Sequence, residues 1–241
     1  MTARRSAPPV RRQRGQGTIE FQVIAAFVLI PLLMFVLQIG LLVIAKNTLN
    51  VAALGVARAG AASGINDAAM KDALALGLAP LNASQAKADT GVGMGDITGG
   101  NYPAVMGAAL ARTKLLDMRF ARITVLNPTT ESFADFGVKK AGGQEVIPVT
   151  KVFDNKEIGK ASGQTRADAL LLKVEVRYCH TLAIPIINAM IRETLNSPLS
   201  GASLEDRICY AVNRVPLVSQ AVVRITVPPI RTALIGKAPS K

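Results

Sequence analysis

The longest hydrophobic stretch of the chain covers residues 21–45, where 25 consecutive positions carry no charged side chain. At about 1.5 Å per residue, a helix of this length exceeds the roughly 30 Å hydrocarbon core of a bilayer. Gln22 and Gln38 are its only strongly polar side chains, and Pro31 leaves the carbonyl of Phe27 without its helical donor. The pattern therefore predicts a transmembrane helix with a mild kink near its centre.

Small residues dominate the continuation of this helix over residues 46–64. Ala53 with Ala57, and Gly55 with Ala59, form pairs that are spaced four positions apart. Such spacing lets two helices approach closely. The alternative is that alanine is present only because it is a good helix former.

Beyond Gly64, which is expected to end the long helix, the hydrophobic pattern changes from a helical to a strand period. Asn66 and Asp67 are expected to cap the next helix. The predicted helices cover residues 67–76 and 102–118, with a glycine-rich loop at 90–100, and the predicted strands cover 122–126, 145–150, 172–179 and 221–227. Residues 182–191 are too few to cross a bilayer, so they are expected to form a core or lid helix. These elements predict an α+β fold.

Composition and charge narrow the choice of protein class. The chain has 241 residues, half of them apolar, which excludes a disordered chain and is enough for one or two domains. Of the net charge of +12, five arginines lie in residues 1–15 and six basic residues follow Asp206, whereas residues 16–206 are nearly neutral. Because positive charge stays inside, we expect a cytoplasmic N-terminus and an exported C-terminal domain on a single-pass protein of the inner membrane. The alternative is a cleaved secretory signal peptide, with a cleavage site at Ala57-Arg58-Ala59 or Ala59-Gly60-Ala61.

One carboxylate, Glu20, stands at the start of the apolar helix, and a glycine follows the cationic run before it. An ionisable group at the edge of the hydrocarbon suggests a functional role, because it is costly there unless it is paired. The alternative is that Glu20 lies in the water interface and interacts with the positive end of the helix dipole.

The run GQGTIEF at residues 15–21 resembles the signature of prepilin-peptidase substrates, in which cleavage after a glycine leaves a glutamate at the fifth position of the mature chain. In the Flp branch an aromatic residue follows this glutamate; Phe21 takes that place here, where the major Flp pilin usually has tyrosine. Over about residues 11–64, the chain resembles the TadE-like minor pseudopilins of tight-adherence (Flp) pilus systems. Gly17 offers a second cleavage point, but only cleavage after Gly15 restores the family spacing.

The resemblance implies three parts: a cleaved basic leader at residues 1–15, a transmembrane and extended helix at 16–65, and an exported, pilin-like α+β domain at 66–241. It implies a processing site made of Gly15, Gln16, Glu20 and Phe21. It also implies as partners the membrane, the prepilin peptidase, other pilus or pseudopilin subunits and the inner-membrane assembly platform. The alternative is an uncleaved single-pass membrane protein with a periplasmic interaction domain.

Two cysteines, Cys179 and Cys209, fall in the part expected to be exported, where an oxidising compartment favours a disulfide. Closing the loop between them stabilises a fold by about 3 to 4 kcal/mol on the chain-entropy model. The alternative is two separately buried thiols. His180 adjoins Cys179, but neighbours on a strand point to opposite faces and do not form a nucleophile and base pair.

No other chemistry is expected. The glycine-rich loop lacks the dinucleotide-binding pattern, and the Gly159-Lys160 pair lacks the P-loop pattern, because Ala161 replaces Ser or Thr. Two cysteines and one histidine lack the spacing of a metal site. The basic C-terminal part carries Tyr210 as its only aromatic residue, which argues against nucleic-acid binding. We therefore expect no enzyme activity, no cofactor and no small-molecule substrate.

Overall fold

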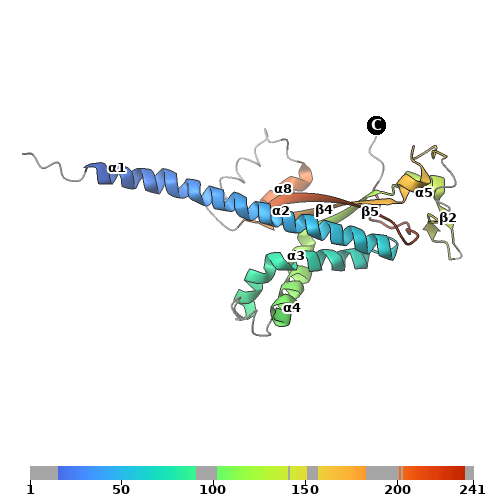
Figure 1. Ribbon diagram of the computed structural model, residues 1–241, viewed down its shortest axis with the longest axis horizontal. Helices are drawn as coiled ribbons and strands as arrows, with labels where there is room; N and C mark the ends of the chain where they lie inside the picture. Colours follow the sequence, from blue (N-terminus) through green and yellow to red (C-terminus); the bar gives the residue numbers. More distant parts are fainter. Residues whose placement is uncertain are drawn as a thin grey trace, which may run out of the picture.

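The long N-terminal helix projects from a head made of a small sheet and further helices (Figure 1). The computed structural model describes residues 16–90, 102–140, 142–150, 157–182, 201 and 203–236. The predicted leader with Gly15 lies outside the described residues, as do nearly all of the glycine-rich loop and of the predicted helix at 182–191. The rest is a mixed helix and sheet fold with one long apolar N-terminal helix, as expected.

The long helix consists of α1 (Gln16–Ile24), a π-helical turn, η1 (Ala25–Leu29), and α2 (Ile30–Ser63). In the π-helical turn, the amide of Ile30 donates to the carbonyl of Ala25, five residues back. Pro31 follows at once and has no amide proton to donate. A π-helical turn, one of the usual local adjustments of a helix next to a proline, thus lies just before Pro31, where the sequence predicted a mild kink.

The turn after α2 follows the predicted stop and cap. Gly64 is left-handed, with φ of 70°, and the amide of Ile65 donates to the carbonyl of Gly60 at 2.9 Å. The Asn66 side chain then accepts from the amides of Ala68 and Ala69 at 2.9 and 3.2 Å. The prediction of an end at Gly64 and a cap at Asn66 is confirmed.

Helix α3 covers Asp67–Thr90, so the predicted end at residue 76 is wrong. The helix continues through Gly77 and Pro80, two residues that ordinarily mark helix ends. It is stabilised by packing against α2, with Met70, Leu74 and Leu78 fully buried on its inner face. Tertiary burial here outweighs the local propensity.

Helices α2 and α3 approach each other closely at Gly77. A Cβ placed there would lie 2.5 Å from Cβ and 2.7 Å from Cα of Ala52. Ala53 and Ala57, one of the two pairs whose spacing suggested close helix packing, are buried in the core. In the other pair, a Cβ on Gly55 would meet nothing within 4 Å. Small residues of α2 and α3 thus pack closely at Ala52 and Gly77, which belong to neither predicted pair, and Gly55 takes no part in this contact.

Gly77→Ala is expected to lower the free energy of unfolding by about 1 to 3 kcal/mol, because the new methyl group meets the Ala52 backbone. Gly55→Ala is the matched control, also inside a helix, and is expected to raise it by about 0.5 to 1 kcal/mol. Denaturant unfolding of the full chain in detergent measures both. Equal gains in the two variants would contradict the close contact.

Strands β1 (Ala121–Asn127), β4 (Leu171–Thr181) and β5 (Arg214–Arg224) form an antiparallel sheet in the order β1-β4-β5. The alternation predicted for residues 172–179 is confirmed: Leu172, Val174, Val176 and Tyr178 are all buried. β5 begins seven residues before the predicted strand at 221–227 and ends at Arg224. It contains Pro216, which an edge strand tolerates.

Two very short strands, β2 (Val138–Lys139) and β3 (Glu145–Val146), form a separate hairpin. The strand predicted at 145–150 is therefore only two residues long. After it, the amide of Ile147 donates to the carbonyl of Pro229 at 3.3 Å, so the backbone finds a partner in the C-terminal segment instead.

The helix predicted at 102–118 is present as three successive segments: α4 (Tyr102–Arg112), the π-helical η3 (Thr113–Asp117) and the 3-10 helix η4 (Met118–Phe120). Three short helices were not predicted: α5 (Thr130–Phe136), α6 (Arg166–Ala169) and α8 (Leu204–Ala211). Each begins with a capping box, at Thr129, Thr165 and Ser203 respectively.

The core lies between α2, α3 and the sheet, and α2 contributes Leu49, Val56 and several alanines to it. Lys46 Nζ donates to the Val218 carbonyl, and Ser219 Oγ donates to Asn50 Oδ1 at 2.8 Å, so the β5 edge is also tied to α2. The second half of α2 is therefore part of the hydrophobic core of the sheet and helices. We call residues 16–44 the stalk and the described residues from Ala45 onward the head.

Candidate functional site

The stalk is covered with exposed apolar side chains. Seventeen large hydrophobic residues between positions 19 and 44 are exposed, Phe27 by 78%. A patch of this extent is far larger than soluble monomers usually expose, so a membrane or a protein partner is needed to cover it. The helix Thr18–Ser63 is long and apolar enough to cross a membrane.

The described residues of the predicted processing site lie at the tip of the stalk. Gln16, Glu20 and Phe21 belong to α1, and Gln16 and Glu20 are four residues apart in it, which places them on neighbouring turns of one face. Glu20 is exposed, forms no ion pair with any residue that the structure describes, and is followed by Phe21, which is 67% exposed. Gly15 lies outside the described residues.

The predicted disulfide between Cys179 and Cys209 is present, with the Cα atoms 5.5 Å apart. It joins β4 to α8 on the outer face of the sheet. The same helix is held by an ion pair between Arg177 Nη1 and Asp206 Oδ1 at 2.8 Å. Outward from these anchors α8 carries Leu204 and Ile208, which are 80% and 62% exposed.

His180 lies on the other face of β4 from Cys179, as expected, and its ring is 6.0 Å from that of Tyr178. Its Nδ1 atom is buried and has no hydrogen-bond partner among the described residues. Burial, and then the positive charge of Arg214, lowers the pKa of His180, so the imidazole is neutral at pH 7. Burial raises the pKa of Tyr178 to about 12, and the carboxylate of Asp117 adds to this shift.

A buried polar group lies at the end of the head nearest to the stalk; it consists of Asn82, Thr113, Asp117 and Arg214, and we call it the base cluster. Asp117 accepts from Arg214 Nη1 at 3.1 Å and from Asn82 Nδ2 at 2.6 Å, and its side chain is only 8% exposed. Asn82 also donates to Thr113 Oγ1 at 2.9 Å. The Arg214 guanidinium lies 4.0 Å from the centre of the Phe120 ring. Sequence analysis missed this cluster, since its two charged members are 97 positions apart.

The loop containing Gly159 and Lys160 holds an anion, but the anion is a side chain of the protein. Asp135 accepts from the amides of Ala161 and Ser162 and from Ser162 Oγ, at 3.1, 2.7 and 2.7 Å. These hydrogen bonds, first of all those from Ser162, lower the pKa of the Asp135 carboxyl. The backbone amides of this loop thus bind a side chain of the protein itself. This agrees with the sequence pattern, which is not that of a phosphate-binding loop.

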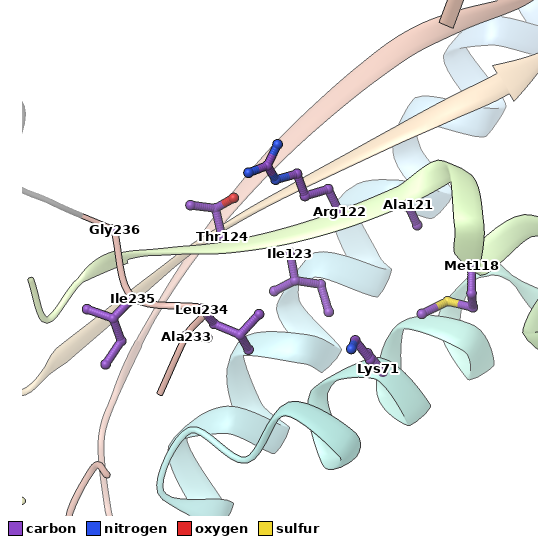
Figure 2. A pocket seen from close by; sticks show the side chains of 10 residues that line it. All are labelled: Lys71, Met118, Ala121, Arg122, Ile123, Thr124, Ala233, Leu234, Ile235 and Gly236. Atoms are coloured by element: carbon purple, nitrogen blue, oxygen red, sulfur yellow. The ribbon is translucent and has the colours of Figure 1, made fainter. Parts of the chain in front are cut away.

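A cavity of about 420 Å³ lies along β1, between Lys71 of α3 and the C-terminal segment (Figure 2). That segment adds to the edge of β1, where the amide of Val125 donates to Leu234 and the amide of Gly236 donates to Val125, both at 2.9 Å. The two cationic residues of the cavity are already engaged: Lys71 with Asp67 and Arg122 with Glu205, each at 2.7 Å. The cavity is therefore a poor site for an anionic ligand.

The part of the chain that the structure describes contains no group of three or more His, Cys, Asp or Glu residues that could hold a metal ion. Comparisons with family models, with curated proteins and with solved structures found no match to this chain.

Proposed function

We propose that this protein is a minor pseudopilin of the TadE-like kind, which a prepilin peptidase processes and which takes part in the assembly of a tight-adherence pilus at the bacterial inner membrane. The observation that carries the proposal is the GQGTIEF junction at the start of one 46-residue apolar helix. The junction supplies a cleavable glycine and a glutamate one helical turn beyond the new N-terminus. The helix supplies the surface through which such a subunit packs.

The charge distribution supports insertion with the N-terminus in the cytoplasm. Five arginines precede the stalk in residues 1–15, and Lys46 is the only charge near its other end before Arg58. On the positive-inside rule, this asymmetry favours an orientation with the head in the periplasm. There the Cys179–Cys209 disulfide is chemically stable.

Processing would change the electrostatics of the stalk tip. Removal of residues 1–15 takes away all five arginines and creates an ammonium group on Gln16, about 6 Å along the helix axis from Glu20. In an assembly of parallel helices, the Glu20 carboxylate of one subunit pairs with the N-terminal ammonium of its neighbour. Such pairing makes a carboxylate tolerable in an apolar environment.

The connection between stalk and head also supports an assembly role. The second half of α2 lies in the core of the head, so the stalk leaves the head as the same continuous helix (Figure 1). Forces applied to the head are thereby transmitted to the membrane segment without a linker. The exposed Leu204 and Ile208 of α8 offer a second surface for a neighbouring subunit.

The test is the N-terminus of the mature chain, read by intact mass and N-terminal sequencing after co-expression with a prepilin peptidase of a tight-adherence system. We expect a chain that begins at Gln16. Gly15→Leu is expected to block the cleavage, and Gly17→Ala is the matched control that leaves it unchanged.

A wild-type chain that still begins at Met1 or Thr2 would contradict processing and favour the uncleaved single-pass protein. A chain that begins at Thr18, together with loss of cleavage in Gly17→Ala, would move the site to the second glycine. A chain that begins after residue 59 or 61 would point to an ordinary signal peptide.

A further inference from the structure

Strand β1 lies at one edge of the sheet, and only part of its outer side is paired. In an antiparallel pair of strands, the backbone groups of successive residues point alternately toward the partner strand and away from it. The amide and the carbonyl of Val125 both bond to the C-terminal segment, so they point away from β4. The amide and the carbonyl of Ile123, two residues earlier on the same strand, therefore also point away from β4.

These outward groups of Ile123 have no backbone partner in the part of the chain that the structure describes. The same holds for the carbonyl of Ala121, the outward acceptor before them, whereas the Ala121 amide donates to the carbonyl of Met118. One donor and two acceptors thus follow one another along an open stretch of the edge. Such a stretch is a template for pairing with another strand.

The C-terminal segment pairs with β1 at Val125 but does not reach this open stretch. Before Val125's partners, the segment makes a turn in which the amide of Ile235 donates to the carbonyl of Thr232 at 3.3 Å. The amide of Arg231 then donates to the carbonyl of Glu145 at 3.1 Å, in the separate hairpin. The chain therefore supplies its own added strand at Val125 and leaves the next positions of the same edge open.

The cavity of about 420 Å³ shown in Figure 2 borders this open stretch, and we call it the edge cavity. Its lining includes Ala121 and Ile123 of the edge itself, Met118 before them and Ala233 of the C-terminal segment. Ala233 is exposed, and so are the side chains of the two cationic lining residues. The edge cavity can therefore be reached from solvent.

The charges of the edge cavity favour an uncharged occupant. Lys71 is paired with Asp67 and Arg122 with Glu205, each at 2.7 Å, so neither cation lacks a counter-charge. What remains open is the set of backbone donors and acceptors, beside apolar side chains such as Met118. An extended peptide offers donors and acceptors at the spacing of a strand, and its alternate side chains fit beside the edge.

We propose that the edge cavity binds an extended, uncharged segment of another polypeptide, which adds to β1 as a further strand at Ile123. The proposal goes beyond the function proposed above and depends neither on processing nor on pilus assembly. In an assembly, such a segment of a neighbouring subunit would join two heads through backbone hydrogen bonds.

The experiment uses the full chain in mild detergent and a short, capped peptide of alternating valine and threonine. Amide hydrogen exchange is measured residue by residue, with and without the peptide. In the free protein, the Ile123 amide is expected to exchange rapidly and the Thr124 amide, which faces β4, slowly. Saturating peptide is expected to slow the exchange of Ile123 by at least about tenfold, because the amide gains a hydrogen bond.

The same peptide with N-methylated amides is expected to bind about tenfold more weakly, because it cannot donate to the carbonyls of the edge. Ala233→Trp is expected to weaken binding of the unmodified peptide by at least about tenfold, since the indole fills the edge cavity. Ala104→Trp is the matched control, at an exposed position of α4 outside the edge cavity, and is expected to leave binding unchanged. Circular dichroism without peptide checks that both variants fold.

Slow exchange of Ile123 in the free protein would overturn the proposal, because the edge would then be paired already by another part of the chain. Unchanged exchange of Ile123 at millimolar peptide, or protection along β5 instead, would overturn it as well. Equal binding of the N-methylated peptide would exclude strand addition. An equal loss in Ala104→Trp would exclude the edge cavity as the site.

Discussion

Asp117→Ala is expected to lower the free energy of unfolding of the full chain by about 3 to 5 kcal/mol, because it leaves the largely buried guanidinium of Arg214 without its carboxylate partner. The Asp117 side chain is 8% exposed and that of Arg214 is 14% exposed, so water cannot replace the lost carboxylate well. Asn82 loses an acceptor at the same time, which adds to the cost. Denaturant unfolding in detergent, followed by circular dichroism, measures the change.

The matched control is Asp72→Ala. Asp72 forms an ion pair with Lys114 at 2.7 Å, which is shorter than the Asp117 pair, but the two side chains are 67% and 46% exposed. Solvent screens such pairs, so we expect a loss of at most about 1 kcal/mol. Equal losses in the two variants would show that burial does not decide the strength of these pairs.

A second comparison separates the value of the ion pair from the cost of breaking it. In the double variant Asp117→Leu with Arg214→Met both charges are gone, and well-packed apolar side chains often replace a buried pair at little cost. We expect the double variant to recover most of the stability lost in Asp117→Ala. If the double variant does not recover this stability, the loss in Asp117→Ala comes from the missing ion pair itself and not from the unpaired charge of Arg214.

Local signals predicted those parts of the fold that depend on neighbours in sequence. The uncharged run predicted the stalk, Gly64 and Asn66 predicted the turn into α3, and the alternation after Leu171 predicted β4. Each of these features is set by a continuous stretch of sequence, through its hydrophobicity, its backbone conformation, capping or the burial of one face. The disulfide was also predicted, because both cysteines lie in the part expected to be exported.

The errors occurred where distant contacts decide the structure. Helix α3 passes through Pro80 because α2 covers its apolar face, and β5 begins at Arg214 because β4 offers a ladder of partners down to Thr181. The base cluster joins residues from three separate segments, and no residue pattern within any one segment predicts it. The capping boxes at Thr129, Thr165 and Ser203, by contrast, are local signals that mark the starts of the three short helices α5, α6 and α8.

The double variant Cys179→Ser with Cys209→Ser is expected to lower the free energy of unfolding by about 3 to 4 kcal/mol, from the entropy of the open loop of about 30 residues. Reductant is expected to lower the stability of the wild-type chain to that of the double variant and to leave the variant unchanged. Both cysteines are replaced together, so that no free thiol remains to form intermolecular bonds. A reductant effect on the double variant would show that the loss has another origin.

The loss of the disulfide should also reveal how α8 is held. The ion pair between Arg177 and Asp206, with side chains 22% and 23% exposed, joins α8 to β4, as the disulfide does. Both links therefore fix the position of this helix. We therefore expect Asp206→Asn to cost more in the double serine variant than in the oxidised protein, since two links between the same elements are not additive. Equal costs in both backgrounds would mean that the capping box of Ser203 and the packing of Tyr210 hold α8 without either link.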